Sequence, residues 1–168
     1  MRSDAESLLV FVSANRRLRY TSAAKPAAKA VRAKSSPSKV SKPDLAPVFS
    51  ALSRVLNTFV GKDVTVQTDK PGDYHLVIPS ILHRKKPIYF AGLRMQKNYV
   101  SFHLLSLYYN PDLMKSMSPA LKKRNQGKAC FNFTQIDPDC FAELERLTAA
   151  GLKKFNSQEF RKYIQSIQ

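Results

Sequence analysis

The stretch that most constrains the fold is KPIYFAGLRMQKNYVSFHLLSLYY, residues 86–109, in which two apolar and aromatic arms flank a short polar break at 96–98. Tyr, Phe, Ile and Val dominate both arms, and such residues favour a pleated, half-buried strand. The polar break is typical of the turn that closes a hairpin. In the second arm, Val100, Phe102 and Leu104 share one face, whereas Ser101 and His103 share the other. The chain is therefore predicted to fold around a hairpin that turns one face toward a core.

Elements before the hairpin follow from spacing and from turn residues. Apolar residues recur at helical spacing over 45–60, so a helix is predicted there, with Asp44 as its cap and Gly61 as its end. Two strands are predicted over 63–68 and 73–78, separated by the turn sequence DKPG. The segment HRKK at 83–86 is read as a basic loop that leads into the hairpin.

After the hairpin, residues 111–117 are predicted to form one or two helical turns. Ser118 is expected to cap a short basic helix that Gly127 stops, and a further strand is predicted over 128–134. Asp137 is expected to open a longer helix that reaches about residue 155. Ser157 is expected to cap a last helix, whose inward residues would be Phe160, Tyr163, Ile164 and Ile167.

Successive strands joined by short turns imply a mainly antiparallel sheet of about five strands. With an N-terminal helix and C-terminal helices on one face, the predicted fold class is α+β. Six apolar side chains of the sheet and the long helix are expected to be buried together: Phe102, Leu104, Phe131, Phe133, Leu144 and Leu147.

Charge divides the chain into two predicted regions, a disordered basic tail over 1–43 and a folded domain over 44–168. The formal net charge of the 168 residues is +16, and residues 1–43 hold ten Lys and Arg against two acids. Residues 21–43 are almost entirely Ala, Lys, Ser and Pro, so they cannot bury enough apolar surface to fold. Weak, salt-sensitive nucleic-acid binding by this tail is one hypothesis; a solubilising linker or sequence upstream of a wrongly assigned start are the alternatives. The tail residues expected to contact nucleic acid are Arg16, Arg17, Arg19, Lys25, Lys29, Arg32 and Lys34.

The expected location is the cytoplasm. There are two cysteines and no C-x-x-C pair, which fits a reducing compartment better than a disulfide framework. No apolar run reaches the roughly 18 residues that span a bilayer, so no membrane partner is expected. Residues 8–12 form a poor secretory signal because Asp4 and Glu6 precede them, and the same acids argue against an organellar presequence.

Two histidines supply the candidate ligand site. Strand alternation places His75 on one face with Asp73, and His103 on one face with Ser101. If the two strands are near neighbours, His75 and His103 converge with Tyr89 on the helix-free face and form a small polar pocket. A polar sheet face with scattered histidines is the alternative. No order of nucleophile, base and orienting group can be read, and no zinc-ligand spacing occurs.

Acidic and basic clusters supply two further hypotheses. Asp139 and Glu143 share a helix face and form a loose carboxylate pair that could bind iron; offsetting the helix dipole is their alternative role. Basic loops such as 84–86 lie near tyrosines that could stack on nucleic-acid bases. Solvated charged loops are the alternative for that pattern.

Several strand sequences resemble those of the YdhG-like family, a group of domains of unknown function. The residues that carry the resemblance are GDY at 72–74, YFAG at 89–92, YVSFHL at 99–104 and GK at 127–128, and it covers about residues 45–156. The resemblance implies a small α+β domain without an assigned activity, and one branch of the family is described as frataxin-like iron chaperones. We therefore expect a non-enzymatic binding or carrier module for a small ligand or a protein. An iron chaperone and a nucleic-acid-associated protein are the alternatives.

Overall fold

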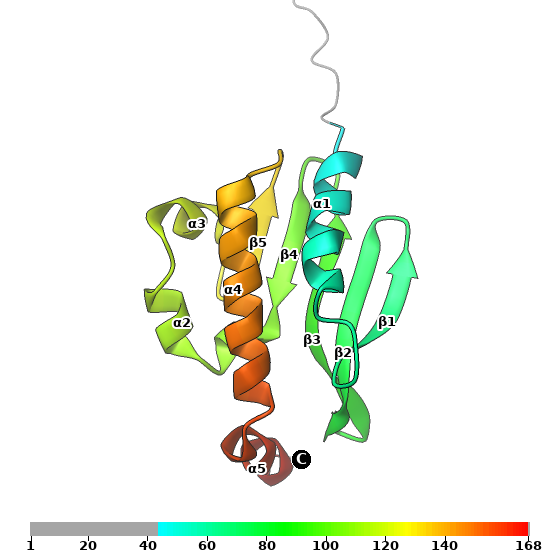
Figure 1. Cartoon of the computed structure of the whole chain (residues 1–168), viewed down its shortest axis with the longest axis vertical. Coiled ribbons are helices and arrows are strands. Elements are labelled where there is room, and N and C mark those ends of the chain that lie inside the picture. The colour runs from blue at the N-terminus through cyan, green and yellow to red at the C-terminus, as the bar shows by residue number, and fades with distance from the viewer. Residues whose placement is uncertain (1–43, 168) are drawn as a thin grey trace, which may run out of the picture. The chain divides into compact units, whose positions relative to one another are not determined.

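Five antiparallel strands form one sheet, and their order in space is their order in the sequence (Figure 1). The computed structural model describes residues 44–167. Predictions that fall on residues 1–43, including the seven basic residues expected to contact nucleic acid, lie outside the described residues. The strands are β1 (Thr65–Lys70), β2 (Asp73–His83), β3 (Lys86–Met95), β4 (Val100–Leu104) and β5 (Cys130–Phe133).

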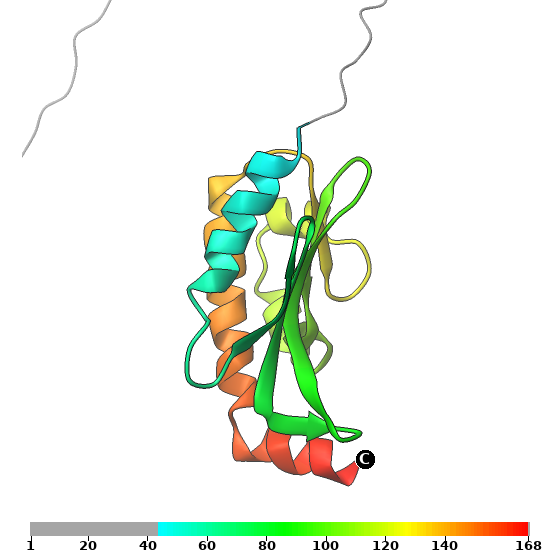
Figure 2. The same ribbon diagram turned by 90° about the vertical axis from the view of Figure 1, so that its right-hand side faces the viewer.

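Helices α1 (Ala46–Asn57) and α4 (Pro138–Phe155) cover one face of this sheet (Figure 2). The 3₁₀ turn η1 (Leu105–Tyr108) and the short helices α2 (Pro111–Lys115) and α3 (Pro119–Arg124) connect β4 to β5. Helix α5 (Gln158–Ser166) follows α4 and packs against β2. The predicted α+β class, with a five-stranded antiparallel sheet and C-terminal helices, is confirmed. No helix among residues 44–167 is long and apolar enough to cross a membrane.

The core lies between the sheet and these helices. All six residues predicted to be buried together belong to it. Four phenylalanines contributed by the strands, Phe90, Phe102, Phe131 and Phe133, are completely buried. Burial of a large aromatic side chain contributes on the order of 3 kcal/mol, so this face of the sheet supplies much of the stability.

Three predicted helix caps are present. The side chains of Ser118, Asp137 and Ser157 accept backbone N–H bonds at 3.1, 3.2 and 3.2 Å, at the starts of α3, α4 and α5. Each bond satisfies a donor that the first turn of a helix leaves unpaired. Asp44 does so for α1, since it accepts a 3.1 Å bond from the Ala46 N–H, although Leu45 occupies the cap position.

Several predicted ends are wrong. Helix α1 ends at Asn57 and not at Gly61, whose N–H instead bonds the Val64 carbonyl and closes the following loop. The second hairpin arm leaves the sheet at Leu104, because its last cross-strand partner on β3 is Ala91. The strands predicted over 63–68 and 128–134 are β1 and β5, which start two residues later.

Two corrections matter for the surface. Strand β2 does not end at residue 78 but continues to His83, so the expected basic loop is a tight turn between β2 and β3. Tyr163 and Ile167 are 48% and 42% exposed and do not face inward. The buried residues of helix α5 are Phe160 and Ile164; Ile167 lies beyond its last residue, and Tyr163 contacts the rings of Tyr109 and Phe160 while it stays half exposed.

Candidate functional site

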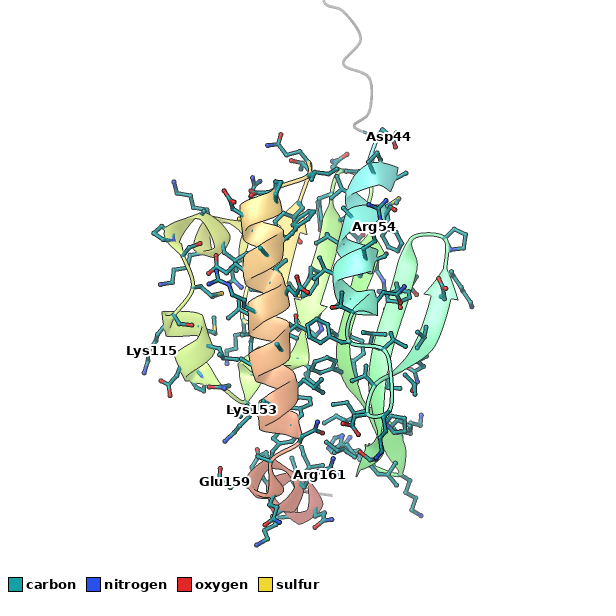
Figure 3. The ribbon with its side chains drawn as sticks, in the orientation of Figure 1. Asp44, Arg54, Lys115, Lys153, Glu159 and Arg161 are labelled. Carbon is teal, nitrogen blue, oxygen red and sulfur yellow. The ribbon has the colours of Figure 1, made fainter. Side chains whose placement is uncertain are left out.

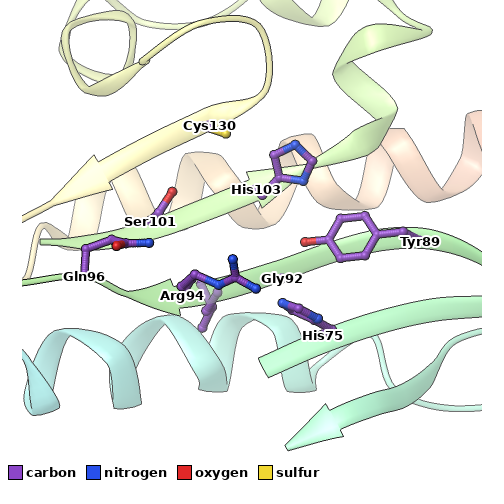
Figure 4. A pocket seen from close by; sticks show the side chains of 9 residues that line it. His75, Tyr89, Gly92, Arg94, Gln96, Ser101, His103 and Cys130 are labelled. Carbon is purple, nitrogen blue, oxygen red and sulfur yellow. The ribbon is translucent and has the colours of Figure 1, made fainter. Parts of the chain in front are cut away.

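The face of the sheet opposite α1 and α4 carries a row of paired residues that crosses four strands. His75 of β2 pairs with Gly92 of β3, Gly92 pairs with His103 of β4, and His103 pairs with Cys130 of β5. Because side chains alternate between faces, residues aligned across the strands project on the same side. The register therefore gathers two imidazoles and a thiol around a position that has no side chain (Figure 4).

An irregularity in β3 adds Tyr89 to this row. Leu76 pairs with Ala91, but the next residue, Val77, pairs with Tyr89, so Phe90 is an extra residue in the strand. Phe90 and Ala91 both lie in the core. An extra residue reverses the alternation beyond it, and Tyr89 consequently lies on the same face as Gly92 instead of the opposite one.

Gly92 makes the room that the Tyr89 side chain occupies. A Cβ atom at Gly92 would lie 2.5 Å from the Tyr89 hydroxyl oxygen, 2.7 Å from His75 Cδ2 and 2.7 Å from the Tyr74 carbonyl oxygen. The tyrosine ring lies between the histidines, with ring centroids 5.5 Å from His75 and 5.3 Å from His103. The structure thus brings His75, Tyr89 and His103 together on the helix-free face, and a ligand for them stays a prediction.

These side chains line a pocket of about 440 Å³. Arg94, Gln96, Ser101 and Cys130 complete its polar lining, and Figure 4 shows their arrangement around Gly92. Among the described residues, no hydrogen bond reaches the Tyr89 hydroxyl, the His103 ring or the Ser101 hydroxyl. The pocket therefore presents several polar groups that remain available to a ligand.

Electrostatics distinguishes the two histidines. One Asp73 carboxylate oxygen lies 3.0 Å from His75 Nε2 and 3.4 Å from Arg94 Nε. Burial, together with the nearby His75, lowers the pKa of His103. Protonation is therefore disfavoured on the histidine that has no carboxylate partner.

Burial raises the pKa of both acidic hydroxyl and thiol groups in the pocket. For the Tyr89 phenol, burial is the largest cause, Cys130 and Asp73 raise the pKa further, and Arg94 lowers it, so that the pKa stays well above the usual value of 10.0. Burial also raises the pKa of the Cys130 thiol. Both groups keep their protons at neutral pH, so the phenol acts as a hydrogen-bond donor and the thiol is a weak nucleophile.

The sequence did not assign Arg94, Ser101 or Cys130 to the site. A usable signal existed for Arg94 and Ser101, since each lies two residues from Gly92 or His103 and so shares its face. Cys130 enters through the β4–β5 register, which alternation alone does not give.

Asp139 and Glu143, the two acids predicted as iron ligands, lie on α4 and not in the pocket. Both carboxylate oxygens of Glu143 accept bonds from Ser118, 2.7 Å from its backbone nitrogen and 2.5 Å from its hydroxyl. Glu143 thereby fixes the start of α3 against α4, while Asp139 lies exposed in the first turn of α4. Across residues 44–167, no three His, Cys, Asp or Glu side chains are grouped so that they could hold a metal ion. The described residues therefore lend no support to Asp139 and Glu143 as iron ligands.

Comparison with family models, with curated proteins and with solved structures finds no match for this chain. The resemblance to the YdhG-like family accordingly stays a prediction. The proposal below rests on the pocket around Gly92, called the open-face pocket because it lies on the helix-free, open face of the sheet.

Proposed function

We propose that this domain binds a small organic anion in the open-face pocket and serves as a binding or carrier module of the YdhG-like type. The observation that carries the proposal is the Tyr89 hydroxyl, which lies over Gly92 between two histidines without a hydrogen-bond partner in the described part of the chain. The hydroxyl is therefore free to donate a hydrogen bond to a ligand that enters the pocket.

The charge of the pocket favours an anion. Only the Nε edge of Arg94 faces Asp73, so its terminal nitrogens are available for a carboxylate or phosphate oxygen. Tyr89, Ser101 and Gln96 supply further donors. The nearby acid, Asp73, already interacts with His75 and Arg94, which reduces its repulsion of an incoming anion.

Binding is a better fit than covalent catalysis. A nucleophilic cysteine needs a lowered thiol pKa, whereas burial raises the pKa of Cys130. Tyr89 keeps its proton for the same reason and cannot serve as a base near neutral pH. The polar groups of the pocket are thus suited to donating hydrogen bonds to a bound anion.

The test follows the ring signals of His75 and His103 by NMR during titration with benzoate, acetate and inorganic phosphate. At least one of these anions should shift both rings together and saturably. Arg94→Gln should abolish the shift. Lys97→Gln, which removes the same charge from the neighbouring turn, should preserve it. Unchanged ring signals with all three anions, or equal responses in wild type and Arg94→Gln, would refute an anion site here.

A further inference from the structure

The turn between β2 and β3 is built from two long cationic residues in an unfavourable backbone conformation. His83 and Lys86 are the last paired residues, so Arg84 and Lys85 alone close the hairpin. Their φ angles are +51° and +64°, in the left-handed region. Two-residue hairpin turns with this conformation favour Asn-Gly, because a Cβ atom is strained there.

The other hairpin turn on β2 uses the expected residue. Gly72, with a φ of +79°, lies between β1 and β2. The same sheet thus accepts strain at Arg84 and Lys85 that it avoids at Gly72. Strain at a solvent-exposed turn is a reason to look for a function of the side chains involved.

The cations of this turn are exposed and unpaired. Arg84, Lys85 and Lys86 are all exposed, and none forms an ion pair with a described residue. Nearby, Arg161 of α5 donates hydrogen bonds of 3.3 and 3.2 Å to the carbonyl and hydroxyl oxygens of Ser80. This contact links α5 to the part of β2 that leads into the turn. Arg161 is labelled on α5 in Figure 3.

Aromatic surface lies beside the cationic turn. A hollow of about 490 Å³ is lined by Arg84 and Lys86 together with Tyr89 and Tyr109. Tyr109 also lines a second hollow of about 370 Å³, together with Tyr108 and Tyr163. Tyr108 and Tyr163 are each 48% exposed. Tyr109 lines both hollows, so the cationic turn and the exposed rings belong to neighbouring hollows.

We infer that this end of the domain binds single-stranded nucleic acid, with Arg84, Lys85 and Lys86 on the phosphates and Tyr108 or Tyr163 stacked on bases. Proteins that bind a single strand without reading its sequence use two elements: cations along a groove that contact the phosphates, and exposed aromatic rings on which the bases stack. Stacking requires unpaired bases, which a duplex does not offer. This surface adjoins the anion pocket, since Tyr89 lines both hollows and the Tyr108 ring lies 6.3 Å from the His103 ring, measured between centroids. The inference nevertheless rests on Arg84, Lys85 and Lys86, which do not line the anion pocket.

The test uses the full chain and a fluorescent single-stranded oligothymidylate, with anisotropy measured over a salt series. The double variant Arg84→Asn with Lys85→Gly removes two charges and installs the residues that the turn favours. Affinity should fall on the order of tenfold at about 0.1 M salt, and the slope of log K against log salt should become shallower by about 1.4. The same variant should melt at a higher temperature than wild type, which excludes unfolding as the cause of the loss.

The matched control is Lys122→Gln with Lys123→Gln, which removes two exposed charges from α3, away from the turn (Figure 1). This control should lose clearly less affinity than the turn variant, since both retain residues 1–43. Equal losses would mean that diffuse charge, and not the turn, binds the strand.

Tyr108→Ala tests the stacking part. It should weaken the affinity for the oligothymidylate by about fivefold or more and reduce the quenching of tyrosine fluorescence by the bound strand. Unchanged affinity in Tyr108→Ala and in Tyr163→Ala would overturn stacking. Stronger binding to phosphatidylserine vesicles than to the oligothymidylate, at equal phosphate concentration, would replace the nucleic acid by a membrane surface.

Discussion

The two faces of the sheet are made from alternate residues of the same strands, yet they are satisfied very differently. On the face toward α1 and α4, Phe102 and Phe131 are completely buried against other apolar side chains. On the open face, the adjacent residues Ser101 and His103 lie half-buried, without hydrogen bonds to their side chains from the described residues. The helix-covered face is closed by apolar packing, whereas the open face has polar groups that a partner could bind.

This difference teaches where stability and recognition reside in the domain. The strand register fixes both faces at once, since a shift by one residue would exchange every side chain between them. The extra residue Phe90 is the exception, because it changes faces locally and moves Tyr89 into the pocket. The strands thus secure their position through the core while they hold the polar row on the other side.

The largest expected effect separates two neighbours on β4. Phe102→Ala should reduce the free energy of unfolding by about 3–5 kcal/mol, because it leaves a cavity in a close-packed core. His103→Ala should cost about 1 kcal/mol or less, since it removes no buried apolar contact of that kind. Urea denaturation of both variants measures the difference. Similar losses in the two would show that the open face is packed as tightly as the core.

Gly92 provides a second test, on the boundary between the faces. Gly92→Ala should cost about 1–3 kcal/mol, because the new methyl group meets the rigid Tyr74 carbonyl and displaces Tyr89. It should also remove any anion-induced shift of the histidine ring signals. Denaturation and NMR on the same sample measure the two effects.

The matched control for that test is Gly61→Ala. No atom lies within 4 Å of a Cβ at Gly61, and its φ is not in the left-handed region. This substitution should be neutral or stabilise the domain slightly. A Gly92→Ala protein as stable as Gly61→Ala would show that Tyr89 does not need the space above Gly92.

Much of the fold could be predicted because its signals are local. The caps Ser118, Asp137 and Ser157 each act on an N–H three residues away, and the alternation of β4 is readable within five residues. The tight turn of Arg84 and Lys85 is not predicted from the sequence, because it lacks the glycine or asparagine that marks such hairpins. A turn built from residues that are unusual for its backbone conformation cannot be recognised from its sequence.

The candidate site could be predicted only in part. Alternation placed His75 and His103 on definite faces of their strands, but their meeting depends on how β2, β3 and β4 are aligned. That alignment includes the irregularity at Phe90, which is set by packing of two consecutive residues into the core and has no signature in the strand's own sequence. The alignment of neighbouring strands, which brings the site residues together, therefore could not be predicted from the sequence alone.

The smallest expected effect concerns pH and the single residue His103. Burial and the neighbouring His75 lower its pKa below the value of about 6.5 that it has in the unfolded chain. Its ring faces Tyr89 and Tyr108, while the carboxylate of Asp73 interacts with His75 and Arg94. Between the two pKa values the unfolded chain holds more protons, so the free energy of unfolding rises with pH in that window.

Acidification below about pH 6.5 should therefore remove stability until the pH falls below the folded pKa of His103, beyond which this contribution no longer changes. His103→Gln should flatten that part of the profile, which urea midpoints measured from about pH 5 to pH 7.5 would reveal. His83→Gln, at the end of β2 and outside the pocket, should retain the wild-type slope. If wild type and His103→Gln lose stability in parallel as the pH falls, another group carries the dependence. A profile that is flattened in His103→Gln but not in His83→Gln would assign this pH dependence of stability to the open face.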